Sequence, residues 1–92
     1  LPPLEAQSLG TPLVISDIPV HREVYEDSAI YFNLNSPSSL IKALDQLKSA
    51  KIYSKLIKKG FDNVNRFNEL RLNNITLAKY GITFNKNNNK GE

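Results

Sequence analysis

The sequence predicts an α/β fold in which short parallel strands are followed by C-terminal helices, the pattern of a partial Rossmann-like domain. Two short apolar runs, 11–16 and 29–32, have the length and β-branched content of buried strands. The first run is apolar on both faces, which is typical of a parallel strand covered by helices on both sides. A longer segment, 50–67, carries apolar residues at helical spacing. Because two short strands do not form a stable sheet alone, we expect earlier strands upstream.

The first helix is predicted directly at the start of the chain. Pro2 and Pro3 can open it, because a proline in the first helical turn loses no hydrogen bond. An apolar stripe and a left-handed glycine cap then define its buried face and its end; these residues are Leu4, Ala6, Leu9 and Gly10.

Turn signals separate the two strands and introduce the next helix. The sequence Asp17-Ile18-Pro19 predicts a turn, and one or two helical turns follow over 20–25. After the second strand, Ser36 is placed to cap a helix that starts at Pro37. The expected core face of that helix is Leu40, Ile41, Leu44 and Leu47.

The helix over 50–67 has the strongest periodicity in the chain. Gly60 costs this helix about 1 kcal/mol relative to alanine, which indicates a close packing contact. Asn68 is expected to cap a last helix that continues through Leu72, Ile75 and Tyr80. The predicted stripe is Tyr53, Leu56, Ile57, Gly60, Phe61, Val64 and Phe67. Residues 1–81 are expected to form part of one domain, and the Asn/Lys-rich tail at 82–92 to be disordered.

Composition excludes several classes of site. The chain has 92 residues, no cysteine and a net charge of +3, so it has no disulfide framework and no thiolate metal site. Residues 1–41 hold five acidic side chains and one arginine, whereas residues 42–92 hold eleven basic and four acidic ones. No apolar run has the length of a membrane span. The chain begins Leu-Pro-Pro without methionine, so we expect it to be a fragment of a longer protein.

Few residues suggest chemistry on their own. Glu5, in a first helical turn, is best explained on its own by favourable interaction with the helix dipole. Asp17 is expected to be a turn residue that bonds its own backbone. Glu23 is expected to cap a helix or to pair with Arg22. His21 has no partners at zinc-ligand spacing, so it is expected to be structural or to lie at the surface.

An ordered set of short motifs resembles the donor-binding domain of retaining glycosyltransferases of the GT-B fold, family 4. The stretch Leu1-Pro2-Pro3-Leu4-Glu5-Ala6 matches the second half of the family motif E-G-F-G-L-P-x-x-E-A. The resemblance continues through Gly10-Thr11-Pro12, Ser16-Asp17-Ile18-Pro19 and Arg22-Glu23-Val24, then to Arg66-Phe67 and Tyr80. Each piece is short, and the specificity lies in their order and spacing.

The resemblance implies a donor site and assigns two residues to it. Glu5 corresponds to the glutamate that accepts hydrogen bonds from the ribose hydroxyls of the donor nucleotide, and Leu1 to a backbone N–H that contacts the diphosphate. The donor would be a GDP- or UDP-sugar, with GDP-mannose as the first expectation. No metal or other cofactor is implied. No catalytic residue falls in this segment, because the Arg/Lys pair that stabilises the leaving diphosphate would lie upstream.

The complete enzyme implied by the resemblance transfers a sugar to a glycan or lipid-linked acceptor in polysaccharide biosynthesis. Its partners would be the nucleotide sugar and its own N-terminal acceptor domain, with no nucleic acid. Its location would be cytoplasmic, with peripheral contact at the inner face of the membrane. This segment alone would be inactive. Glu69 stands where the family often has an aromatic residue, which affects the packing of the last helix and not the donor site.

A different class of function is also compatible with the residues. A non-catalytic α/β module could bind a partner or an anionic membrane surface through a basic helix at 48–59. Such a basic face is otherwise simply solvated. Its lysines lie opposite the apolar stripe, at Lys51, Lys55, Lys58 and Lys59.

Overall fold

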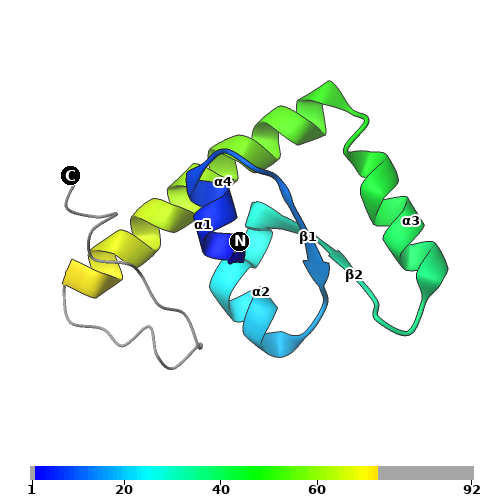
Figure 1. Ribbon diagram of the computed structural model, residues 1–92, viewed down its shortest axis with the longest axis horizontal. Coiled ribbons are helices and arrows are strands. Elements are labelled where there is room, and N and C mark those ends of the chain that lie inside the picture. Colours follow the sequence, from blue (N-terminus) through cyan, green and yellow to red (C-terminus); the bar gives the residue numbers. More distant parts are fainter. Residues whose placement is uncertain (1, 73–92) are drawn as a thin grey trace.

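The computed structural model describes residues 2–72, which form a small α/β unit (Figure 1). Leu1, the predicted last helix beyond Leu72 and the tail at 82–92 lie outside the described residues. The elements are α1 (Pro3–Ser8), β1 (Leu13–Ser16), α2 (Pro19–Tyr25), the short 3-10 helix η1 (Glu26–Ser28), β2 (Ala29–Phe32), α3 (Pro37–Gln46) and α4 (Ala50–Leu72).

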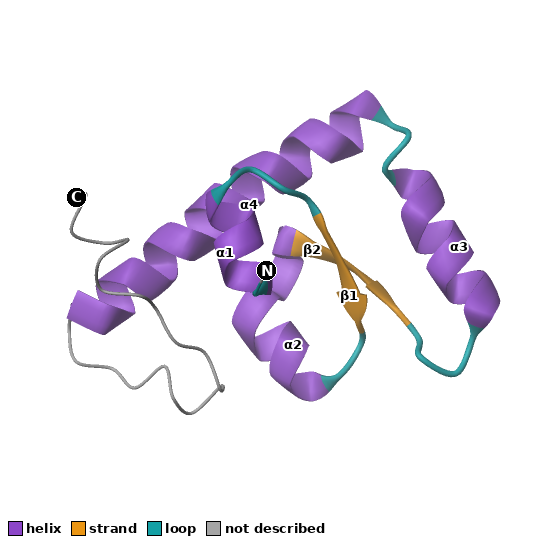
Figure 2. Cartoon of the chain, in the orientation of Figure 1, coloured by secondary structure: helices purple, strands orange, loops and turns teal. Residues whose placement is uncertain are grey.

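The two strands pair in parallel, as the sequence predicts. Their register aligns Leu13 with Ala29 and Ser16 with Phe32, and the connection between them is formed by α2 and η1 (Figure 2). Both strands therefore end at the same edge of the sheet. The N–H of Asp17 continues the ladder by donating to the Phe32 carbonyl at 2.8 Å. The predicted α/β class with short parallel strands is confirmed.

Helix α1 ends as the sequence predicts, but its buried face differs. Gly10 has a φ of +78°, and its N–H donates to the Gln7 carbonyl at 3.0 Å, so it closes the helix in the left-handed conformation. Leu9 was expected in the core but is 71% exposed. It lies beyond the last helical residue, Ser8, and does not continue the helical spacing. Gln7, three residues after Leu4, takes the buried position instead.

The main core lies where α4 crosses α1, η1 and the sheet. Phe67 is its most buried side chain and anchors the C-terminal half of α4. A second, smaller cluster joins β2, α3 and the first half of α4 through Ile30, Ala43 and Leu56. The main cluster consists of Leu4, Ala6, Leu13, Ile15, Val24, Tyr25, Ala29, Val64 and Phe67.

Helix α4 begins where the periodicity predicts but is longer and buries a narrower stripe. It passes through Asn68 without a break, so the predicted helix end at Phe67 and cap at Asn68 were wrong. An asparagine inside a helix costs only a few tenths of a kcal/mol, less than ending a packed helix would. Tyr53 and Phe61, at the edges of the predicted stripe, are each 43% exposed. The line that is buried runs through Leu56, Gly60, Val64 and Phe67.

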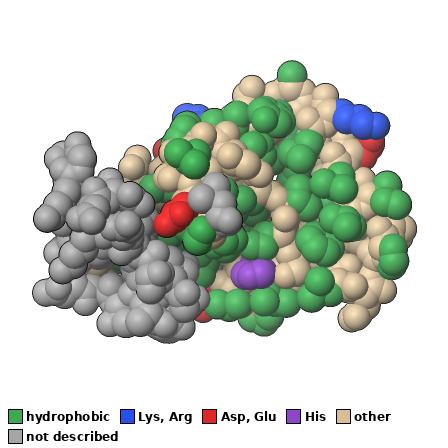
Figure 3. Space-filling model, in the orientation of Figure 1, with side chains coloured by type: hydrophobic (Ala, Val, Ile, Leu, Met, Phe, Trp, Pro, Cys, Tyr) green, Lys and Arg blue, Asp and Glu red, His purple; other side chains and the backbone are tan. Residues whose placement is uncertain are grey.

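Helix α3 has the predicted cap but not the predicted core face. The N–H of Ser39 donates to the Ser36 hydroxyl at 3.3 Å, which confirms the cap. Of this helix only Ala43 is fully buried, and Leu47, just after it, is partly buried. Among residues 2–72 the sheet has two strands, so it is too narrow to cover a broader helix face. Leu40, Ile41 and Leu44 are exposed, and Figure 3 shows hydrophobic side chains at the surface over α3.

The two described glycines, Gly10 and Gly60, should respond in opposite ways to alanine. A Cβ at Gly60 would lie 3.5 Å from the Gln7 side chain, an ordinary contact, so Gly60→Ala should stabilise the fold by up to about 1 kcal/mol. A Cβ at Gly10 would meet Phe61 at 3.3 Å in a left-handed conformation, so Gly10→Ala should destabilise by about 1–2 kcal/mol.

Urea unfolding followed by circular dichroism measures both effects. A Gly60→Ala protein that is clearly less stable than the parent would show that the contact with Gln7 is tighter than described.

Candidate functional site

Glu5 lies in the first turn of α1 and is the predicted site residue that the structure describes. Helix α1 and strand β1 run in opposite directions (Figure 1). Its neighbours Leu4 and Ala6 are buried, while Glu5 is half-buried. Within residues 2–70, no side chain forms a hydrogen bond or ion pair with the Glu5 carboxylate. Both carboxylate oxygens can therefore accept hydrogen bonds from a ligand.

Leu1, the second predicted site residue, precedes the described residues. Its predicted contact with a diphosphate stays a prediction. Within α1, the side chain of Ser8 donates to the Glu5 backbone carbonyl, so this bond leaves the carboxylate uninvolved.

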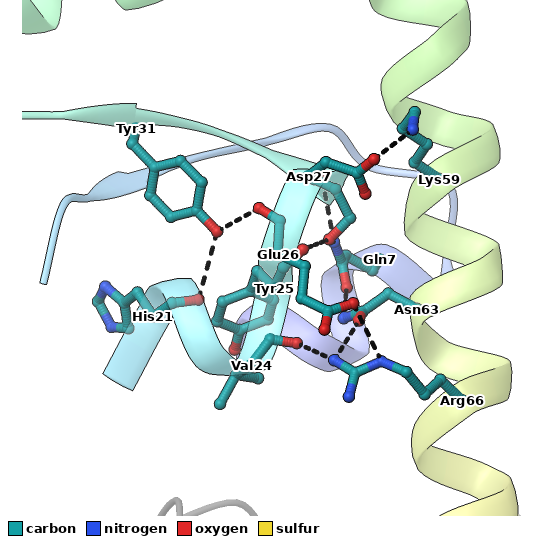
Figure 4. A network of polar contacts seen from close by, with 11 residues as sticks. Gln7, His21, Val24, Tyr25, Glu26, Asp27, Tyr31, Lys59, Asn63 and Arg66 are labelled. Carbon is teal, nitrogen blue, oxygen red and sulfur yellow. Dashed lines mark hydrogen bonds and ion pairs between the residues drawn. The ribbon is translucent and has the colours of Figure 1, made fainter. Parts of the chain in front are cut away.

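A buried amide next to Glu5 ties α1 to the rest of the fold. Gln7 is 1% exposed, and its Nε2 donates to the Ser28 hydroxyl at 2.8 Å and to the Ser28 carbonyl at 3.3 Å. Its Oε1 accepts from Asn63 Nδ2 at 2.9 Å (Figure 4). One side chain thus joins α1 to η1 and to α4.

Arg66 extends this network toward the end of α2. Its Nη2 donates to the Asn63 side-chain oxygen at 2.8 Å and to the Val24 carbonyl at 2.6 Å (Figure 4). Its guanidinium lies 4.5 Å from the centre of the Phe67 ring, and its Nε is 3.5 Å from the Glu26 carboxylate. The series Gln7, Asn63 and Arg66 therefore links three helices.

The turn after α2 has a strained conformation and is held by contacts on both sides. Glu26 has a φ of +47°, which is uncommon for a residue other than glycine. Its carbonyl accepts from the Tyr31 hydroxyl at 2.7 Å. On the other side of the turn, Lys59 of α4 pairs with Asp27 and lowers the pKa of that carboxyl by hydrogen bonding to it. Contacts from both sides thus hold the turn in place.

Sequence reasoning did not single out Gln7 or Asn63. Gln7 stands three residues after the core residue Leu4, and Asn63 stands three residues after Gly60. The signal in the sequence was a polar residue at a core position of each helix. Two such buried amides can form hydrogen bonds to each other.

At the edge where the strands end, Asp17 and Arg22 form an ion pair. Two guanidinium nitrogens of Arg22 lie 2.7 and 2.8 Å from the two Asp17 carboxylate oxygens. Asp17 was expected to bond its own backbone, but this bidentate pair takes the carboxylate instead. Arg22, offered above as a partner for Glu23, is thus bound to Asp17. The guanidinium also lies over the Tyr31 ring at 3.9 Å.

His21 interacts with the strand that precedes it. Its Nδ1 lies 2.9 Å from the Ser16 carbonyl and 3.1 Å from the Ser16 hydroxyl, and its ring meets the Tyr25 ring edge-on at 6.1 Å. This half-buried arrangement agrees with the expected structural role. Among the described residues, no three His, Cys, Asp or Glu side chains gather as a metal site would require.

The basic face of α4 is smaller than the sequence indicates. Lys51, Lys55 and Lys58 are exposed, but Lys59 is occupied by its ion pair with Asp27. In the part of the chain that the structure describes, none of the helices combines the length and apolar character needed to cross a membrane.

Comparison with known proteins finds similarity to bacterial mannosyltransferases. The chain is 38% identical over 69 residues to the O-antigen chain mannosyltransferase RfbU of Salmonella typhimurium, covering 70% of this chain and 20% of RfbU. It is 39% identical over 46 residues to the serotype-specific mannosyltransferase WbdA of Escherichia coli, covering 50% of this chain and 6% of WbdA. The chain thus spans about a fifth of RfbU. No protein-family model and no solved structure matches it.

Both relatives are mannosyltransferases by name, and this supports the resemblance to glycosyltransferases seen in the sequence.

The Asp17–Arg22 pair predicts a pKa change that NMR can measure. Hydrogen bonding and charge from Arg22 lower the pKa of Asp17 below its ordinary value of 3.8, so Arg22→Ala should return it to about that value. Because the folded-state pKa is the lower one, the pair stabilises the fold above pH 3.8, and this stabilisation is lost as pH falls through the folded-state pKa.

Carbon-13 NMR titration of the Asp17 carboxyl gives the answer. Lys59→Ala serves as the control, because it should raise the pKa of Asp27 and leave Asp17 unchanged. An unshifted Asp17 in the parent protein would contradict the pairing.

Proposed function

We propose that this chain is the donor-binding segment of a retaining glycosyltransferase of the GT-B fold, family 4. The enzyme would transfer a sugar, with mannose as the first candidate, from a nucleotide diphosphate sugar to a glycan or lipid-linked acceptor. The observation that carries this proposal is the similarity to two mannosyltransferases, which reaches 69 residues in RfbU. The parallel α/β arrangement of the described residues is compatible with part of a Rossmann-like donor domain.

Glu5 is the residue to which we assign donor recognition. A carboxylate has two acceptor oxygens, which can receive hydrogen bonds from two neighbouring hydroxyls of a ribose. Glu5 is half-buried, and its carboxylate has no partner among the described side chains, which leaves it free for such a ligand. The backbone of Leu1 would contribute to binding of the diphosphate.

The chemical step would depend on groups outside this segment. Departure of a nucleoside diphosphate is favoured by positive charge that stabilises the leaving phosphate oxygens. We assign those groups, and binding of the acceptor, to an N-terminal domain and upstream residues of the same enzyme. The proposed reaction needs no metal or other cofactor, and the segment alone would be inactive.

The proposal also includes a cytoplasmic location and peripheral contact with the inner face of the membrane. The three exposed lysines of α4 form the surface for that contact, since basic side chains are attracted to anionic lipid headgroups. If this contact exists without nucleotide binding, the alternative of a non-catalytic α/β module would be favoured.

Replacing Glu5 should weaken binding of the donor nucleotide. Hydrogen bonds to a charged acceptor contribute roughly 1.5–3 kcal/mol, so Glu5→Ala in the whole protein should raise the Kd for GDP or GDP-mannose by about 10- to 100-fold. Isothermal titration calorimetry with GDP and UDP measures this effect and identifies the preferred base.

Glu69→Ala is the matched control, since Glu69 is an exposed carboxylate on α4 and should leave the Kd unchanged. Equal nucleotide affinity in the Glu5→Ala and parent proteins would remove the ribose assignment.

The lysines of α4 should bind anionic vesicles through their charge. We expect the whole protein to co-sediment with phosphatidylglycerol vesicles at low salt, and replacement of Lys51, Lys55 and Lys58 by Glu to abolish this, at about 1 kcal/mol per lysine removed. Neutral phosphatidylcholine vesicles are the control. Absence of salt-sensitive binding would end the membrane part of the proposal.

A further inference from the structure

Helix α1 cannot hold Glu5 in place by its own stability. It has six residues, and no side chain caps its start. Isolated helices of this length are not stable in water, because the first turn fixes many torsions for few hydrogen bonds. The position of Glu5 is therefore determined by how α1 packs against the rest of the fold.

Two kinds of contact hold α1, and they constrain it differently. Leu4 and Ala6 are buried in the main core, which keeps the helix against its neighbours. Apolar contacts are non-directional and restrict rotation of a helix about its axis only weakly. Gln7 adds directed bonds to Ser28 and Asn63, which lie on two separate elements. Because these bonds point in different directions, they fix both the rotation and the height of α1.

The hydrogen bonds around Gln7 are buried and restrict the movement of its side chain. Gln7, Ser28 and Asn63 are 1%, 2% and 5% exposed, so water does not compete for their hydrogen bonds. Asn63 is in turn held by Arg66, which also binds the Val24 carbonyl. The Gln7 side chain also packs against α4 at Gly60, where a Cβ would lie 3.5 Å from it. Figure 4 shows Gln7 next to Asn63, with Arg66 on the far side of Asn63.

We propose that Gln7, Asn63 and Arg66 are positioning residues of the donor site, which act by fixing α1 and through it the carboxylate of Glu5. This inference rests on the proposed function, since it assumes that Glu5 binds the ribose. A ligating group must be held within a fraction of an ångström of its productive position, and a buried hydrogen-bond network two residues away provides such a hold.

The test is nucleotide affinity in the whole protein with the network interrupted. Gln7→Leu keeps the bulk of the side chain and removes its hydrogen bonds. We expect the Kd for GDP, or for UDP if that is the better ligand, to rise on the order of tenfold, the lower end of what supporting partners contribute at metal sites. Asn63→Asp is the second variant: it keeps the acceptor for Arg66, but it replaces the donor to Gln7 by a charged acceptor oxygen that faces the Gln7 oxygen.

A rise in the Kd caused by lower stability must be distinguished from a rise caused by displacement of Glu5. Ile30→Val removes packing in the second cluster, away from α1, and should lower the melting temperature without changing the Kd. In Gln7→Leu/Asn63→Leu, two apolar side chains face each other and Arg66 keeps the Val24 carbonyl but loses its acceptor on Asn63, so stability should recover in part relative to Gln7→Leu while the Kd stays raised. The inference is overturned if the Kd follows the melting temperature across all these variants.

The outcome also distinguishes this inference from the proposed function. If Glu5→Ala weakens nucleotide binding and both Gln7→Leu and Asn63→Asp bind normally, Glu5 is a ligand but the network does not position it. If Glu5→Ala itself binds normally, the ribose assignment fails.

Discussion

The side-chain amide of Gln7 joins three elements that are far apart in the sequence. It donates to Ser28 in η1 and accepts from Asn63 in α4, while its own backbone belongs to α1. An amide buried without partners would cost about 1–3 kcal/mol, so each of these groups needs the others in place. The short helix α1, the strained turn at Glu26 and the middle of α4 are therefore mutually dependent.

The apolar core is divided unevenly between the two ends of the unit. Its main cluster lies under α4 and ends at Phe67, whereas the second cluster is small and leaves much of α3 exposed. A sheet of two strands cannot cover a broad helix face. Consequently the half of the unit that carries Glu5 is held together by both apolar and polar contacts. The half that carries α3 has fewer contacts of each kind.

Sequence patterns predicted the positions of the helices and strands better than they predicted which faces of those elements are buried. The runs that became β1 and β2, the cap at Ser36 and the glycine at position 10 are local signals, and the structure has each of them. The exposed face of α3 depends on the width of the sheet, which no local pattern contains. Likewise, the continuation of α4 through Asn68 is decided by packing on both sides of that residue.

The candidate site could be predicted only in part from the sequence. From the residues alone, a contact with the helix dipole is the favoured role of Glu5, and the ligand role follows from the resemblance to a glycosyltransferase motif. The partner of Asp17 was missed because turn propensity says nothing about a guanidinium five residues away. Gln7 was missed because a polar residue at a core position is recognised only once its partner Asn63 is known.

The ribose role of Glu5 can be seen directly in a crystal structure of the whole protein with its nucleotide sugar. Both ribose hydroxyls should lie within about 2.7–3.0 Å of the Glu5 carboxylate oxygens, with the hydrogen bond between Gln7 and Asn63 intact. A ribose bound elsewhere, with Glu5 facing solvent, would contradict this role.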